Sequence, residues 1–131
     1  DITIEDIRTG LQTFIPSEKL TPGRLNFFHF KNFTMLADFA HNPHGLNLLC
    51  DFVSKLDFKT KIGVISGTGD RRDDDIRELG EISGKHFDEI IIRCDKNLRG
   101  RTADEIMGLL EEGIRKVNTT VPIIKIANEN E

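Results

Sequence analysis

The sequence predicts an α/β domain with three layers (α/β/α) around a mainly parallel, Rossmann-like sheet that has an antiparallel N-terminal edge strand. Apolar runs of strand length, rich in isoleucine and valine, alternate with segments whose apolar residues recur at helical spacing. Gly, Pro, Asn or Asp residues stand at most transitions between these segments. After an initial hairpin, the order of strands and helices is that of parallel strands joined by right-handed helical crossovers.

A short helix and a linker are predicted ahead of the alternating region. Thr3, with Asp6 three residues further on, resembles a capping box, and the apolar residues of 4–14 follow at helical spacing. Residues 17–23 are polar and contain Pro and Gly, which is typical of a linker.

The alternating region begins with a predicted hairpin. Residues 25–30 and 33–39 have strand composition, and Lys31-Asn32 suits the turn between them. We then expect helices over 43–55, 73–86 and 102–117 and strands over 61–66, 88–94 and 121–127. The strand over 33–39 is expected to join the last three, which makes a parallel sheet of four strands with one antiparallel partner at its edge.

Composition narrows the classes of function. The chain has 131 residues, 37% of them apolar, which suits one domain with its own core. A net charge of −4 disfavours a protein that binds nucleic-acid backbone. We expect no membrane span and no secretory leader. Cys50 and Cys94 fall inside a predicted helix and strand, so buried free thiols are expected and the cytoplasm is the expected compartment.

A polar motif, Asp38 to Pro43, joins the end of a predicted strand to the start of a helix. Asn42 is a good N-cap, and Pro43 suits the first helical position. A carboxylate, an imidazole and a helix start therefore meet where ligands bind in open α/β sheets. His41 and His44 have a spacing that permits metal ligation, but neither a Cys nor an acidic cluster joins them, and no metal site is expected.

Two charged loops follow the next two strands. Gly67-Thr68-Gly69 precedes a helix, as in phosphate-binding loops, although it matches neither a dinucleotide fingerprint nor a P-loop. Asp70, Arg71 and Arg72 give this loop charges for an acidic or zwitterionic substrate, whereas residues 73–75 suit a helix start. The second loop, residues 95–101, carries charged residues of both signs, and a charged surface loop is the competing interpretation.

Four motifs, in order, resemble the C-terminal domain of the Mur ligase family, and most of all its cyanophycin synthetase branch. They are Pro22-Gly23-Arg24, Asp-Phe-Ala-His-Asn-Pro at 38–43, Gly-Thr-Gly-Asp-Arg-Arg-Asp at 67–73, and Asp95 through Arg99-Gly100-Arg101. The family consists of ATP-dependent ligases that join an amino acid to a carboxylate. The resemblance implies that residues 1–22 are a helix and linker remnant of an upstream ATPase domain, and that 23–131 are the C-terminal domain. Family members continue with one more helix and strand, which we expect to be missing here.

The resemblance also implies roles for single residues. Arg24 would reach the ATP phosphates, because guanidinium forks suit phosphate oxygens, and Asp38 would hydrogen-bond the ribose. These two would be the catalytic residues of the chain, with His41 and Asn42 beside the adenine. Mg²⁺ and a P-loop lysine would come from the missing central domain of the same polypeptide, which is the expected partner.

The incoming amino acid is expected between the two charged loops. The residues that would bind it are Gly69, Asp70, Arg71, Arg72, Asp95, Arg99 and Arg101. The chain lacks the Asp-Asn-Pro-Arg run of members that add diaminopimelate, so arginine is the first guess, with Asp95 on its cationic end. The isolated chain is expected to be inactive. The alternative is a non-catalytic α/β module that binds a nucleotide or a partner.

Overall fold

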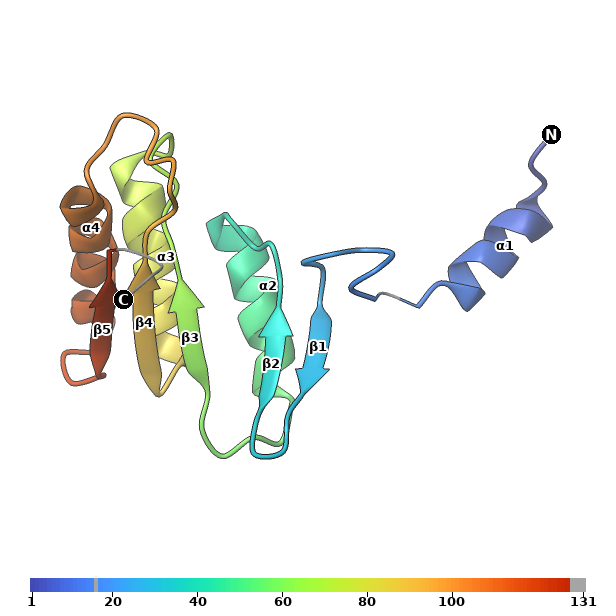
Figure 1. Cartoon of the computed structure of the whole chain (residues 1–131), viewed down its shortest axis with the longest axis horizontal. Coiled ribbons are helices and arrows are strands. Elements are labelled where there is room, and N and C mark those ends of the chain that lie inside the picture. The colour runs from blue at the N-terminus through green and yellow to red at the C-terminus, as the bar shows by residue number, and fades with distance from the viewer. Residues whose placement is uncertain (16, 128–131) are drawn as a thin grey trace. The chain divides into compact units, whose positions relative to one another are not determined.

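The structure is a computed structural model that describes residues 1–15 and 17–127 (Figure 1). These residues form two compact units, of which the first ends at Phe39 and the second begins at Ala40. The first unit contains α1 (Ile4–Thr13), β1 (Asn26–His29) and β2 (Thr34–Ala37). The second contains α2 (Pro43–Ser54), β3 (Ile62–Ile65), α3 (Asp73–His86), β4 (Glu89–Arg93), α4 (Ala103–Val117) and β5 (Ile123–Ile126). Each predicted helix and strand is found, and the strands are shorter than expected.

Helix α1 begins with the predicted capping box. The Thr3 hydroxyl accepts a hydrogen bond from the Asp6 N–H at 3.2 Å, and the Asp6 carboxylate accepts one from the Thr3 N–H at 2.9 Å. The helix is amphipathic, but none of its residues is buried in the first unit. Its N-terminus is therefore fixed by local hydrogen bonds rather than by packing.

Strands β1 and β2 form the predicted antiparallel hairpin. Asn26 lies opposite Ala37 at its open end. At the turn, the Phe30 N–H donates to the Phe33 carbonyl oxygen at 2.9 Å, and the two rings stack with centroids 4.5 Å apart. The open end of the hairpin therefore brings residues just after the linker next to the start of the 38–43 motif.

The second unit is built on a parallel sheet in the order β3-β4-β5. Ile90 and Ile92 of β4 are fully buried, whereas the residues between and beside them are only partly buried. This alternation directs one face of the sheet to α3 and α4, which pack against each other. Figure 1 shows both helices behind the sheet, and α2 packs beside α3.

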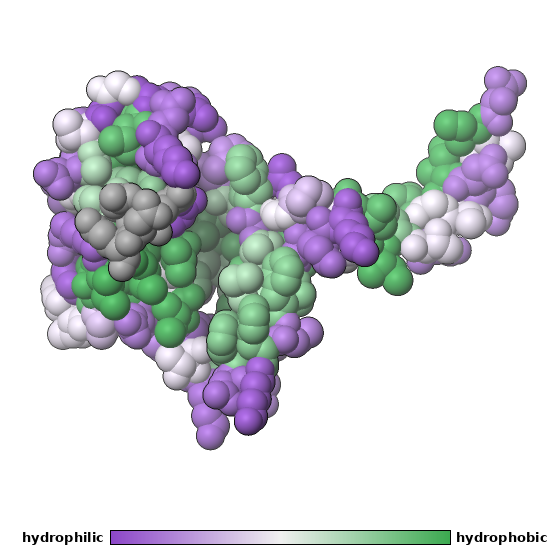
Figure 2. All heavy atoms as spheres, in the orientation of Figure 1, coloured by the Kyte–Doolittle hydropathy of each residue, from purple (hydrophilic) through white to green (hydrophobic). Residues whose placement is uncertain are grey.

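The other face of this sheet carries exposed apolar side chains. Ile62, Val64 and Ile124 are 53%, 60% and 46% exposed. Figure 2 shows hydrophobic residues gathered on this face. Among the described residues of the second unit, α3 and α4 lie on the opposite face of the sheet.

The α/β class, the parallel sheet and the N-terminal antiparallel hairpin are confirmed. The expected four-stranded parallel sheet has three strands among the described residues, because β2 has hydrogen-bonded ladder pairing with β1 alone. Alternation of strands and helices predicts which strands run parallel to one another, but it does not fix which edges bond.

The core of the second unit depends on close helix packing. Fully buried side chains from both helices and the sheet meet there: Ile76, Ile90, Ile92, Ile106, Leu110 and Ile114. Gly113 of α4 approaches α3 so closely that a Cβ at this position would lie 1.9 Å from the Arg77 carbonyl oxygen. Gly63 of β3 makes room for Phe87, whose ring would be 2.4 Å from a Cβ there.

Two sequence predictions about cysteines and membranes can be set beside the structure. Cys50 and Cys94 are free and buried, as predicted. No helix within the described ranges is long and apolar enough to cross a membrane.

Candidate functional site

The turn that precedes β1 is organised by a buried asparagine. Asn26 is 3% exposed, and its side chain accepts a hydrogen bond from the Gly23 N–H at 2.7 Å and donates one to the Arg24 carbonyl at 3.1 Å. Gly23 and Leu25 have φ values of 70° and 49°, in the left-handed region. The side chain of Asn26 thus holds in place a turn that backbone preference alone would not favour.

Arg24 and Asp38 meet at this turn. The Asp38 carboxylate accepts a hydrogen bond from the Leu25 N–H at 3.0 Å, and the Arg24 guanidinium carbon lies 5.0 Å from the centroid of the Phe39 ring. Arg24 is exposed, so its guanidinium faces solvent while the ring supports it. The first unit therefore presents the two residues that the sequence assigned to the nucleotide at one end of one hairpin.

His41 and Asn42 lie at the start of the second unit. The Asn42 side chain accepts a hydrogen bond from the Gly45 N–H at 2.8 Å and caps α2, with Pro43 in the first helical turn as predicted. This engages the Asn42 side-chain oxygen in the helix cap. His41 is half-buried beside it.

The loop after β3 is compact and buried at its glycines. A Cβ at Gly67 would lie 2.8 Å from a methyl group of Ile106, and the Arg71 N–H donates to the Thr68 carbonyl at 3.1 Å. The Thr68 hydroxyl is buried and has no hydrogen-bond partner among the described residues. The loop is thus a tight turn against the helices, with its charged residues directed outward.

The loop after β4 ends in a turn with unusual backbone geometry. Arg99 and Gly100 have φ values of 50° and 89°, and the Arg101 N–H closes the turn on the Leu98 carbonyl at 3.1 Å. The side chain of Asn97 supports it by accepting from the Arg99 N–H at 3.0 Å. A non-glycine residue with left-handed backbone costs about 1–2 kcal/mol, so this geometry is held by its surroundings.

The loops after β3 and β4 contact each other directly. Arg99 forms an ion pair with Asp70. Arg101 donates to the carbonyl oxygens of Gly69 at 2.9 Å and Arg71 at 3.0 Å. At Gly69 the loops touch so closely that a Cβ would lie 2.0 Å from the Leu98 carbonyl oxygen.

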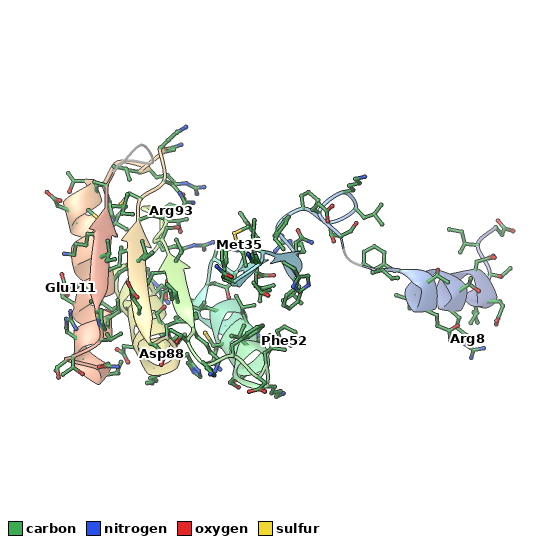
Figure 3. The ribbon with its side chains drawn as sticks, turned by 60° about the horizontal axis from the view of Figure 1, so that its bottom comes forward. Arg8, Met35, Phe52, Asp88, Arg93 and Glu111 are labelled. Carbon is green, nitrogen blue, oxygen red and sulfur yellow. The ribbon has the colours of Figure 1, made fainter. Side chains whose placement is uncertain are left out.

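Two other predicted substrate-binding residues, Arg72 and Asp95, form ion pairs with residues close to them in the sequence. Arg72 binds Asp75 in the first turn of α3 at 2.8 Å. Asp95 binds Arg93 at 2.9 Å, and Figure 3 shows Arg93 at the end of β4 from which the 95–101 loop leaves. Thr102 caps α4 by accepting from the Glu105 N–H at 3.2 Å. The Glu105 carboxylate accepts a hydrogen bond from the Arg101 guanidinium at 3.0 Å.

The charges of the loops shift pKa values in consistent directions. Partial desolvation would raise the pKa of Asp70, but the hydrogen bond and the positive charge of Arg99 outweigh it, and the net shift is downward. The pKa of Arg101 is raised above its ordinary value, mainly by its hydrogen bond to Asp73. Both groups therefore stay charged through the neutral range.

Sequence reasoning missed Asn26 and the hollow beside the loops. Asn26 had one available signal, a polar residue that opens an apolar strand. A shallow hollow of about 210 Å³ lies on the sheet face without helices, lined by Val64, Ile91, Arg93, Cys94 and Ile126. Its lining is mostly apolar, so it does not share the chemistry of the charged loops.

The chain matches one protein family along most of its length. The family model for the Mur ligase glutamate ligase domain matches residues 23–129. Cyanophycin synthetase of Geminocystis herdmanii is 42% identical over 130 residues, 99% of this chain and 15% of that protein. Cyanophycin synthetase of Crocosphaera subtropica is 39% identical over 130 residues, again 99% of this chain and 15% of that protein.

A solved structure supports the fold. Folylpolyglutamate synthase of Mycobacterium tuberculosis, complexed with ADP and AMPPCP, has a TM-score of 0.70 at 17% identity, over 98% of this chain and 26% of that chain. The chain belongs to the Mur ligase family and corresponds to its C-terminal domain. It spans about one seventh of the length of the cyanophycin synthetases that it matches.

Proposed function

We propose that this chain is the C-terminal domain of an ATP-dependent acid–amino acid ligase of the cyanophycin synthetase type. The proposal is supported by about 40% identity to cyanophycin synthetases over nearly the whole chain. The observation that carries it in the structure is the pair of loops after β3 and β4, which hold side chains of both charges against each other. Such a site suits an amino acid that itself carries both charges.

The reaction proceeds in two steps. A substrate carboxylate oxygen attacks the γ-phosphorus of ATP, which releases ADP and leaves an acyl phosphate. The amine of the incoming amino acid then attacks the acyl carbon, the amide bond forms, and phosphate leaves with the loss of one proton. The first step depends on positioning and on neutralising charge rather than on a covalent enzyme intermediate.

The hairpin of the first unit supplies the nucleotide contacts in this proposal. Arg24, exposed and supported by Phe39, neutralises phosphate oxygens, and the Asp38 carboxylate keeps lone pairs for ribose hydroxyls beyond its bond to Leu25. His41 and Asn42 border the base. In this proposal Mg²⁺ is held by the upstream part of the same polypeptide.

The incoming amino acid binds at the 67–72 and 95–101 loops in this proposal. Asp95 takes the cationic end of arginine, and an arginine of the two loops takes its carboxylate. The acceptor carboxylate and the P-loop lysine come from the upstream part of the same polypeptide. The isolated chain is thereby inactive.

The test begins with the coding sequence upstream of residue 1. A Gly-Lys-Ser/Thr loop there supports the ligase, and its absence supports a non-catalytic binding module. The full-length protein is then incubated with ATP, arginine and an aspartate-rich acceptor, and ADP and new amide bonds are measured. Release of ADP that requires both arginine and acceptor is expected; binding of ATP without any amide formation would overturn the proposal.

A further inference from the structure

We propose that Arg101 is a positioning residue, which fixes the backbone of the 67–72 loop so that the Arg71 guanidinium faces the carboxylate of the incoming amino acid. This inference rests on the proposed function and names the group that reads the substrate anion. It begins from the contacts of Arg101, whose side chain is 20% exposed.

All three nitrogens of the Arg101 guanidinium contact protein oxygens. Its Nε donates to the Gly69 carbonyl at 2.9 Å and its Nη2 donates to the Arg71 carbonyl at 3.0 Å. Its Nη1 lies 2.7 Å from the Asp73 carboxylate and 3.0 Å from that of Glu105. A planar fork is needed to meet two carbonyls and two carboxylates at once, which an ammonium group cannot do.

The remaining arginines of the two loops differ in their contacts. Arg99 is paired with Asp70, and Arg72 with Asp75. Arg71 is exposed and makes no ion pair within residues 1–15 and 17–127. Among the arginines of the two loops, Arg71 is therefore the candidate to bind a ligand anion, whereas the Arg101 guanidinium already contacts protein carboxylates and carbonyls.

Arg101 acts on Arg71 through the backbone. Its hydrogen bonds to the carbonyls of Gly69 and Arg71 span the turn from which the Arg71 side chain leaves. Two features fix the second loop so that Arg101 reaches the first. Gly69 packs closely against the Leu98 carbonyl, and Arg99 has a left-handed backbone. The site is therefore assembled before substrate arrives, which reduces the ordering cost of binding.

A double-mutant cycle in the full-length ligase tests this inference. Arg71→Met removes the charge, and Arg101→Lys keeps a charge beside Asp73 and Glu105 but loses the fork. We expect Arg71→Met to raise the KM for the incoming amino acid about tenfold or more with little change in the KM for ATP. Arg101→Lys raises the same KM less, and the double variant is no worse than Arg71→Met alone.

Arg77→Ala is the matched control. Arg77 also joins α3 to α4, through Glu112 at 2.8 Å, but it contacts neither loop. We expect its removal to leave both KM values unchanged. The positioning role would be overturned if the double variant raised the KM for the amino acid by the product of the two single effects. It would also be overturned if the KM values for the amino acid and for ATP rose equally. If Arg101→Lys does not fold, Glu105→Gln, which loosens the same guanidinium, replaces it in the cycle.

A second measurement separates this inference from the proposed function. Amide hydrogen exchange over residues 68–71 is compared in the wild-type chain, Arg101→Lys and Arg77→Ala. Faster exchange in Arg101→Lys alone supports the hold on the loop even if the protein forms no amide bond. Unchanged exchange in that variant would overturn it, whatever the protein catalyses.

Discussion

The carboxylate of Asp38 accepts a hydrogen bond from the backbone N–H of Leu25 at 3.0 Å. The bond joins the residue that follows β2 to Leu25, thirteen residues earlier in the chain, in the turn that also carries Arg24. A change at Asp38 therefore acts on the geometry of the turn as well as on any ligand. The choice of substitution decides which of these effects is measured.

Asp38→Asn and Asp38→Ala should separate the two effects. Asparagine can still accept from the Leu25 N–H but carries no charge, whereas alanine loses both. In the full-length ligase we expect both variants to reduce turnover about ten- to a hundredfold. The midpoint temperature of thermal unfolding should be lowered only in the alanine variant. Wild-type turnover in Asp38→Asn would remove the carboxylate from the nucleotide site.

Arg24→Ala should also reduce turnover about ten- to a hundredfold without unfolding the protein. Phe39→Leu provides a graded comparison, because it removes only the ring that lies 5.0 Å from the guanidinium. An exposed cation–π contact contributes about 0.5–1 kcal/mol, so a two- to fivefold loss is expected. Steady-state kinetics with varied ATP measures both, and a larger loss in Phe39→Leu than in Arg24→Ala would contradict the assignment.

Asp95→Asn should raise the KM for a cationic amino acid more than the KM for ATP. The carboxylate is half-buried and bound to Arg93 at 2.9 Å, so a cationic substrate would share or replace that partner. Asp51→Asn, on an exposed position of α2, is the control. Equal use of neutral and cationic amino acids before and after the change would exclude Asp95 from selectivity.

Glycine substitutions in α4 should have opposite effects on stability. A Cβ at Gly113 would lie 1.9 Å from the Arg77 carbonyl oxygen, so Gly113→Ala forces α3 and α4 apart and should cost about 1–3 kcal/mol or more. Gly108 has nothing within 4 Å of an added Cβ. Gly108→Ala should therefore stabilise the helix by about 0.5–1 kcal/mol. Urea unfolding of both variants measures the difference.

The stability of the chain should fall at alkaline pH through Cys50. Burial, with a smaller effect of the Asp51 charge, raises the pKa of this thiol from 9.0 to about 11. The folded chain then binds more protons than the unfolded chain between pH 9 and 11, so the free energy of unfolding falls as pH rises through that window. Below pH 9 the contribution is fully present.

Urea unfolding at several pH values, in wild type and Cys50→Ala, measures this slope. The lysines titrate in both proteins, so the difference between the two slopes belongs to Cys50. We expect a shallower decline in Cys50→Ala. Identical slopes would show that the thiol is not desolvated in the folded state.

Local patterns predicted the helices and strands well because each has its own signal. Thr3 and Asn42 cap helices as predicted. The pairing of β2 was not predictable in the same way, because edge-to-edge bonding depends on contacts between distant segments.

The candidate site was predictable as a set of loops but not as a set of roles. The carboxyl ends of parallel strands share one edge of the sheet, so the contact between the 67–72 and 95–101 loops followed from topology. Sequence spacing could not show which charges neutralise each other. The structure pairs Arg99 and Arg101 with protein groups, and this leaves Arg71 as the candidate for a substrate anion.

The contact between Gly63 and Phe87 has a consequence for how the chain finds its fold. Strand β3 is apolar on both faces, so burial alone distinguishes poorly between its correct pairing with β4 and a pairing shifted by one residue. Only the correct alignment sets a residue without a side chain beneath the Phe87 ring, because a shift by one would bring Val64 or Ile62 there. Gly63 thus helps to define the register between β3 and β4. An alanine at this position would destabilise the native register relative to a shifted one.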